Sequence, residues 1–285
     1  MEAQAQPRQL RQMTLSEVLN GAFSICRAHF GDLMKTVAVV LVPAQLIGLI
    51  VLLAAPDGTT DLLLGTTDPQ DTVEGESVLA VLVFSGLSSL ASLLATAAAY
   101  RFTSDSYLGF EIGWRESISY ALRKLHSIIW VLLLAGLGIT VGFLLLIVPG
   151  VFIAIAWALA IPVLLSEDAR GSKALGRSYR LVRGHWWKTF GTLIIAGIIV
   201  GLLQAALSAV VGLAVADSDS TSFEAVLATL LYLVLYLISI PFTTAVLTLI
   251  YFDLRARKEG VDLALAAEGI GGGTSGEGGS AAPGG

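Results

Sequence analysis

The sequence predicts an all-α polytopic membrane protein with six transmembrane helices. Only 14% of the 285 residues are charged and 55% are hydrophobic, whereas about 25% of the residues of a soluble domain are charged. Charged residues are missing from five long runs, and all 17 Lys and Arg residues fall in four clusters. Six crossings of the membrane place those four clusters on one side.

Each predicted span comes from a run without Asp, Glu, Lys or Arg, since a helix needs about 20 apolar residues to cross the hydrocarbon core. The runs are 36–56, 77–100, 125–166, 189–216 and 225–252. Four of them suit one crossing each, and the third, with 42 residues, suits two. Pro149-Gly150, near its middle, predicts the turn. The predicted spans are about 33–55, 77–100, 127–147, 150–166, 189–214 and 225–252.

The distribution of basic residues predicts that both termini are cytoplasmic, because Lys and Arg near spans stay on that side. The two other connections, 56–76 and 215–224, contain Asp and Glu but no basic residue. We expect a flexible N-terminus at 1–13 and a membrane domain at 14–258. Residues 259–285 are rich in Gly, which predicts a disordered cytoplasmic tail.

Stretches before three outward-going spans predict amphipathic helices in the membrane interface. In the first, Thr14 and Glu17 match a capping box. Its apolar face contains Leu15, Val18, Leu19, Ala22, Cys26 and Phe30. The third pairs an apolar stripe of Leu175, Tyr179, Val182 and Trp186 with a basic stripe, as in helices that lie on anionic lipid. The middle stretch, about 113–126, has a weaker pattern with Arg115, Arg123 and Lys124.

An internal repeat accounts for these stretches. Residues 16–30 align without gaps on residues 172–186, with Ser, Leu, Arg and His identical at equivalent places. We interpret the chain as three units, each an interfacial helix followed by a two-span hairpin. The alignment supports the two outer units, and the middle unit is included by its position alone.

Three segments carry a resemblance to a known family: residues 15–23, 173–187 and 249–263, the last containing Tyr251-Phe-Asp-Leu-Arg255. The chain resembles the bacterial glycerophosphoryl diester phosphodiesterase membrane-domain family over about residues 13–265. Some members of that family join the membrane domain to a soluble phosphodiesterase barrel. No such barrel fits in this chain, so the resemblance implies a bacterial plasma-membrane protein and carries no catalytic residue onto it.

Polar and small residues within the predicted spans have two readings. Gln45 and Gln204 suit hydrogen bonds between helices better than substrate contacts. The pairs Gly138/Gly142 and Gly197/Gly201, and a stripe of Ser85, Ser89, Ser92 and Thr96, suit close helix packing better than a polar path. No ionisable residue lies at predicted membrane depth, which argues against a proton-coupled pump.

All three histidines, His29, His126 and His185, precede outgoing spans. If the repeat brought them together they would form a three-His metal site, but no carboxylate lies at a matching spacing to orient the rings. Ordinary interfacial histidine is the better interpretation, and no cofactor is expected.

The basic stripe is the strongest candidate site. Aromatic residues anchor at headgroup depth, and each nearby cation contributes about 1 kcal/mol toward anionic lipid. Topological anchoring alone is the competing interpretation. The predicted headgroup-binding residues are Lys173, Arg177, Arg180, Arg183, Trp186, Trp187 and Lys188.

The sequence contains no phosphate-binding Gly loop, nucleophile elbow or His-Glu-x-x-His pattern. We therefore expect a non-enzymatic, accessory or lipid-interacting module, with membrane lipids and other membrane proteins as partners and no nucleic acid. The alternative is a transporter or lipid-translocating protein, which the internal repeat favours. A continuous polar cavity reaching the bilayer midplane would distinguish it.

Overall fold

The computed structural model describes residues 12–56, 59, 62, 75–110, 113–215 and 221–272. Within these residues the regular elements are helices: α1 (Leu15–Ala28), α2 (Phe30–Leu53), α4 (Gly75–Leu108), α5 (Trp114–Leu145), α6 (Ile147–Trp157), α7 (Ala160–Glu167), α8 (Ser172–Val182), α9 (Trp186–Val215) and α10 (Thr221–Gly272). The predictions for residues 1–11, for most of 57–74 and for the last part of the tail, 273–285, lie outside the described residues.

Six helical segments are long and apolar enough to cross a membrane. They are Phe30–Leu53, Gly75–Leu108, Trp114–Leu145, Ile147–Glu167, Trp186–Val210 and Thr229–Gly260. The all-α polytopic fold is thereby confirmed. The fourth segment combines α6 and α7, which meet at Ala158 and Leu159.

Two short helices precede spans, as the repeat predicts. Helix α1 begins at a complete capping box, in which Thr14 and Glu17 bond reciprocally. It ends at Ala28 with His29 as its C-cap, and α2 begins at Phe30. Helix α8 ends at Val182 with Arg183 as its C-cap, and Gly184, at φ 91°, separates it from α9. The aligned histidines, His29 and His185, therefore both lie at the junction between a short helix and a span.

The middle stretch differs from this arrangement. Residues 114–126 form the first turns of α5 and continue into the span without a break. No glycine lies between Gly113 and Gly136, so nothing in this stretch favours a left-handed residue such as the one that ends α8.

The turn between α5 and α6 lies at Leu146, which is extended (φ −165°, ψ 155°), and not at Pro149-Gly150. Pro149 lies in the first turn of α6, where a missing N–H costs nothing because that donor has no partner within the helix. Gly150 packs against α5, since a side chain there would lie 2.5 Å from the Phe143 ring.

The end of α10 also differs from the prediction of a disordered tail at 259–285, because the helix continues to Gly272. Residues 261–268 are rich in Ala and Leu, which are strong helix formers. The run of glycines begins only after that segment, and the helix ends within it.

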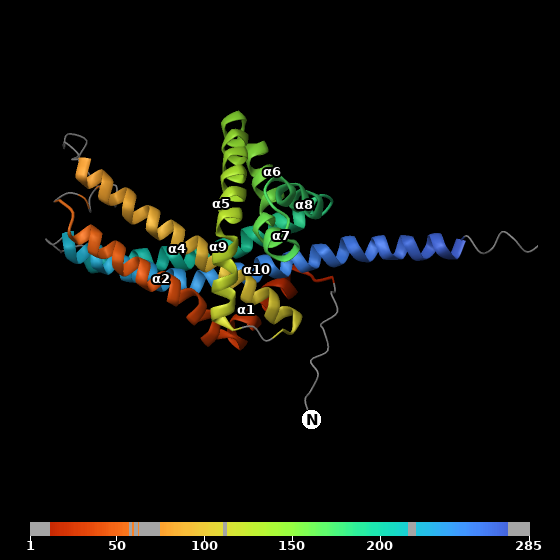
Figure 1. Cartoon of the computed structure of the whole chain (residues 1–285), viewed down its shortest axis with the longest axis horizontal. Coiled ribbons are helices and arrows are strands. Elements are labelled where there is room, and N and C mark those ends of the chain that lie inside the picture. The colour runs from red at the N-terminus through yellow and green to blue at the C-terminus, as the bar shows by residue number, and fades with distance from the viewer. Residues whose placement is uncertain are drawn as a thin grey trace, which may run out of the picture.

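The axes of α2, α4 and α10 are roughly aligned with one another, and α5 and α6 stand at a steep angle to them (Figure 1). The larger cluster of buried side chains joins the short helices α1, α7 and α8 to α4, α5 and α10, and includes Val18, Tyr100 and Leu181. A smaller cluster, including Val37 and Ala95, joins α2 to α4. The short helices are therefore part of the packed core.

Only one of the two predicted glycine pairs lies at a contact between described helices. A Cβ on Gly142 would lie 3.0 Å from the Gly150 Cα, and one on Gly138 would lie 2.4 Å from the Trp157 ring. These two glycines let α5 and α6 approach closely. Gly197 and Gly201 have no other atom within 4 Å of that position, so the second pair packs against nothing in the described part of the chain.

The two glutamines also differ. The Ser88 hydroxyl donates to the Gln45 amide oxygen across α2 and α4, at 3.3 Å, which confirms the interhelical hydrogen bond expected for Gln45. Gln204 is exposed on α9.

Candidate functional site

The helix α8 presents the predicted basic stripe. Its buried face comprises Ala174, Leu175, Ser178, Leu181 and Val182. The Ser178 hydroxyl donates to the Ala156 carbonyl of α6 at 2.8 Å, which fixes the rotation of the helix. The predicted apolar stripe is therefore partly displaced, since Tyr179 is 37% exposed.

Arg177 points into a network of ion pairs between α7, α8 and α10. Its guanidinium donates two hydrogen bonds to Glu167, at 2.8 and 3.2 Å, and a third to Glu259 at 3.3 Å. The Tyr251 hydroxyl also donates to Glu167, at 2.9 Å, and Arg255 pairs with Glu259 at 2.8 Å. The hydrogen bonds to Glu167 raise the pKa of Arg177. Arg177 therefore holds three helices together.

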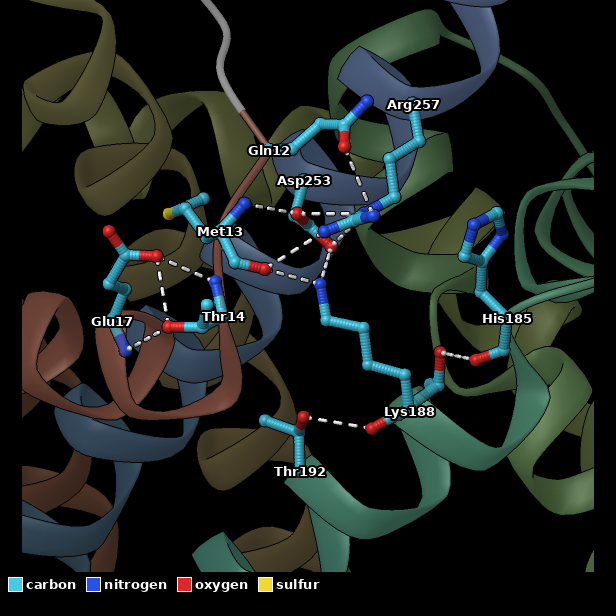
Figure 2. Close-up of polar contacts among 10 residues, drawn as sticks. Gln12, Met13, Thr14, Glu17, His185, Lys188, Thr192, Asp253 and Arg257 are labelled. Atoms are coloured by element: carbon cyan, nitrogen blue, oxygen red, sulfur yellow. Dashed lines mark hydrogen bonds and ion pairs between the residues drawn. The ribbon is translucent and has the colours of Figure 1, made fainter.

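Lys188 is also engaged within the protein (Figure 2). Its ammonium group donates to Asp253 and to the Met13 carbonyl, both at 2.5 Å. Asp253, whose side chain is 2% exposed, also accepts from the Met13 amide at 2.6 Å and from Arg257 at 3.1 Å. The Arg257 guanidinium donates a further bond to the Met13 carbonyl at 3.0 Å. This Asp253 network ties the segment before α1 to the first turn of α9 and to α10.

His185 lies beside the Asp253 network (Figure 2). Its Nδ1 atom is buried and has no hydrogen-bond partner within the described part of the chain. Burial lowers the pKa of His185, and the positive charges of Arg257 and Lys258 lower it further. The ring is therefore expected to be neutral near pH 7.

The other two histidines do not join His185 in a site. The His29 ring packs edge-on against Phe102, with centroids 5.9 Å apart. Among the residues that the structure describes, no group of three His, Cys, Asp or Glu side chains is close enough to hold a metal ion. A three-His site is therefore not formed.

The remaining predicted cations, Lys173, Arg180 and Arg183, are exposed on α8. Over the described ranges of the chain, none of these three side chains has a hydrogen-bond or ion-pair partner. Lys173 and Arg180 line an open cavity of about 310 Å³ between α7 and α8, together with Ser172, Gly176, Arg177 and Glu167. Three cations on this surface are thus available to an anion outside the protein.

The two tryptophans at the start of α9 lie differently. Trp187 is 77% exposed, as suits an aromatic anchor at headgroup depth. Trp186 stacks on Phe152 of α6 and on Phe190, with centroids 5.8 and 5.0 Å apart. The seven predicted residues therefore separate into four that face outward, two that brace the helices and one that packs on α6.

The sequence reasoning missed the two polar networks. Asp253 directly follows the last predicted span, and an acid just before Arg255, Arg257 and Lys258 is a signal for local pairing. Its contact with Met13 is separated by 240 residues along the chain. Only the tertiary fold brings those groups together.

Comparison with known proteins gives a family and no function. No curated protein and no solved structure matches the chain. A family model described as a domain of unknown function, DUF8558, matches residues 116–267. This region holds α8, both polar networks apart from Met13, and more than half of the 285 residues. The chain therefore belongs to the DUF8558 family.

Proposed function

We propose that this chain is a non-catalytic accessory protein of the bacterial plasma membrane that binds anionic phospholipid headgroups at its cytoplasmic face. The binding surface consists of Lys173, Arg180 and Arg183 on α8, with Trp187 beside them. The observation that carries the proposal is that these three cations are exposed and unpaired within the described residues, although α8 itself is firmly packed.

The contrast with Arg177 and Lys188 supports this proposal. Those two cations are held by Glu167 and Asp253, so their charge is largely balanced inside the protein. Within the described residues, the side chains of Lys173, Arg180 and Arg183 have no such acidic partner. A cation close to an anionic membrane surface contributes about 1 kcal/mol, which corresponds to about fivefold in an association constant.

The orientation and the bacterial source belong to the same proposal. The four basic clusters favour cytoplasmic termini, and this places α8 at the inner leaflet. The resemblance of residues 249–263 to the glycerophosphoryl diester phosphodiesterase membrane-domain family supports a bacterial membrane module.

Lipid selectivity tests the proposal. The protein is reconstituted with phosphatidylglycerol and phosphatidylcholine, and the preference of the lipid shell is measured with spin-labelled versions of each. The variant Lys173→Gln/Arg180→Gln/Arg183→Gln is expected to lose most of the preference for phosphatidylglycerol. Arg177 is left intact because its loss would disturb the packing of α7, α8 and α10.

A charge-matched control separates a site from a general effect of net charge. The variant Arg27→Gln/Arg115→Gln/Arg123→Gln removes three exposed cations outside α8, and it is expected to keep most of the selectivity. Equal selectivity in the wild type and in the α8 variant would refute the proposed binding surface.

A further inference from the structure

A second cavity lies on the other side of α8, where this helix meets α6 and the start of α9. Its volume is about 150 Å³, and its walls include Phe152, Ala156, Val182 and Trp186. The lining is almost wholly apolar. An apolar cavity of about 150 Å³ is large enough for a molecule of the size of benzene. This cavity therefore suits a short hydrocarbon segment.

The walls of this cavity are held in place by contacts between the three helices. The Ser178 hydroxyl ties α8 to the Ala156 carbonyl of α6 at 2.8 Å. The Trp186 indole N–H donates to the Phe152 carbonyl at 3.4 Å, and the two rings stack. The cavity therefore exists before a ligand binds, and filling it costs little conformational entropy.

A cation lies at the rim of the cavity. Arg183 lines it next to Gly184 and is exposed, with no ion-pair partner in the described part of the chain. An apolar cavity with an unpaired guanidinium at its edge is complementary to an amphiphile that carries an anionic group. A guanidinium binds phosphate oxygens in bidentate geometry.

We propose that this cavity binds a segment of one acyl chain of an anionic phospholipid whose phosphate is bound by Arg183. This inference rests on the proposed function and adds to it a single bound lipid with a defined chain position. Diffuse attraction of the membrane surface to α8 would give headgroup selectivity without any lipid in the cavity.

Photo-crosslinking locates the chain. The full-length protein is reconstituted with phosphatidylglycerol that carries a diazirine on one acyl chain, and the labelled peptides are identified by mass spectrometry. The same diazirine chain on phosphatidylcholine is the comparison probe. We expect the phosphatidylglycerol probe to label peptides containing Phe152 or Val182 about fivefold more than the phosphatidylcholine probe does. Only phosphatidylglycerol carries a net negative charge, and its attraction to one cation, Arg183, corresponds to about fivefold in binding.

Two variants test the cavity and its rim separately. Ala156→Leu fills the cavity and is expected to abolish the labelling of these peptides, whereas Ala154→Leu, on the same helix but outside the lining, is expected to retain it. Arg183→Gln alters only an exposed side chain, so it should fold normally, and it is expected to lower phosphatidylglycerol labelling to the level of phosphatidylcholine.

The outcomes distinguish this inference from the proposed function. Unchanged labelling in Ala156→Leu, or equal labelling by both probes in the wild type, would overturn the bound acyl chain. If the lipid shell still prefers phosphatidylglycerol in that case, the headgroup surface stands and only the cavity proposal falls. If that preference is also absent, both proposals fall.

Discussion

Removing the charge of Asp253 is the most direct test of the network that joins the N-terminal segment to α9 and α10. In the variant Asp253→Asn the side chain keeps its size but no longer balances Lys188 and Arg257. Its carboxylate is 2% exposed, and the two cations are 25% and 22% exposed. Breaking a buried ion pair costs about 3–5 kcal/mol. Because both cations reach some solvent, we expect about 3 kcal/mol, the lower end of that range.

A matched control uses an exposed Lys–Asp pair, Lys124 with Asp168. Asp168 pairs with Lys124 and Arg170, and its side chain is 58% exposed. An exposed ion pair contributes little to stability, so Asp168→Asn is expected to cost much less than Asp253→Asn. The free energy of unfolding is measured in mixed micelles by titration with SDS, with tryptophan fluorescence as the signal. A loss in Asp253→Asn no larger than the loss in Asp168→Asn would refute the structural role of the network.

Two further predictions concern packing and pH. Gly142→Leu is expected to lower the free energy of unfolding by about 1–3 kcal/mol through overpacking, since its Cβ would lie 3.0 Å from the Gly150 Cα. The control Gly136→Leu, on the same helix, has open space around it and is expected to cost less. Equal losses in the same SDS titration would contradict the close contact. The pKa of His185 is lowered in the folded protein from its ordinary value of 6.5, so the unfolded chain binds more protons as the pH falls. The contribution of His185 to the free energy of unfolding is therefore present above about pH 6.5 and is lost as the pH falls below it. The variant His185→Gln is expected to flatten this part of the curve of unfolding free energy against pH. An unchanged slope would rule out His185 as its source.

The spans follow from the sequence because their cause is local. A charged side chain at membrane depth costs free energy. Runs without charge therefore locate the crossing helices, however those helices pack against each other. The capping box at Thr14 and Glu17 is local in the same sense, because its partners are three residues apart. The position of the α5–α6 turn depends also on contacts between the two helices. Pro149 is compatible both with a turn and with the first turn of a helix, and the packing of Gly150 on Phe143 accompanies the second arrangement.

The basic stripe shows where sequence reasoning ends. Helical periodicity puts Lys173, Arg177 and Arg180 on one face, and it treats their charges as equivalent. Arg177 differs only because Glu167 and Glu259, from two other helices, lie within hydrogen-bond distance of its guanidinium. Charge on a helix face can be counted from the sequence, but the charge left free after pairing depends on neighbours that are distant along the chain.

The sequence by itself determined that this is an all-helical membrane protein with six spans, since hydrophobicity and helix length act residue by residue. The tertiary structure alone decided that Met13 and Lys188 meet Asp253, that Gly142 meets Gly150, and that an apolar cavity lies behind Arg183. Those contacts depend on how whole helices cross and rotate against each other. No periodicity within one helix contains that information.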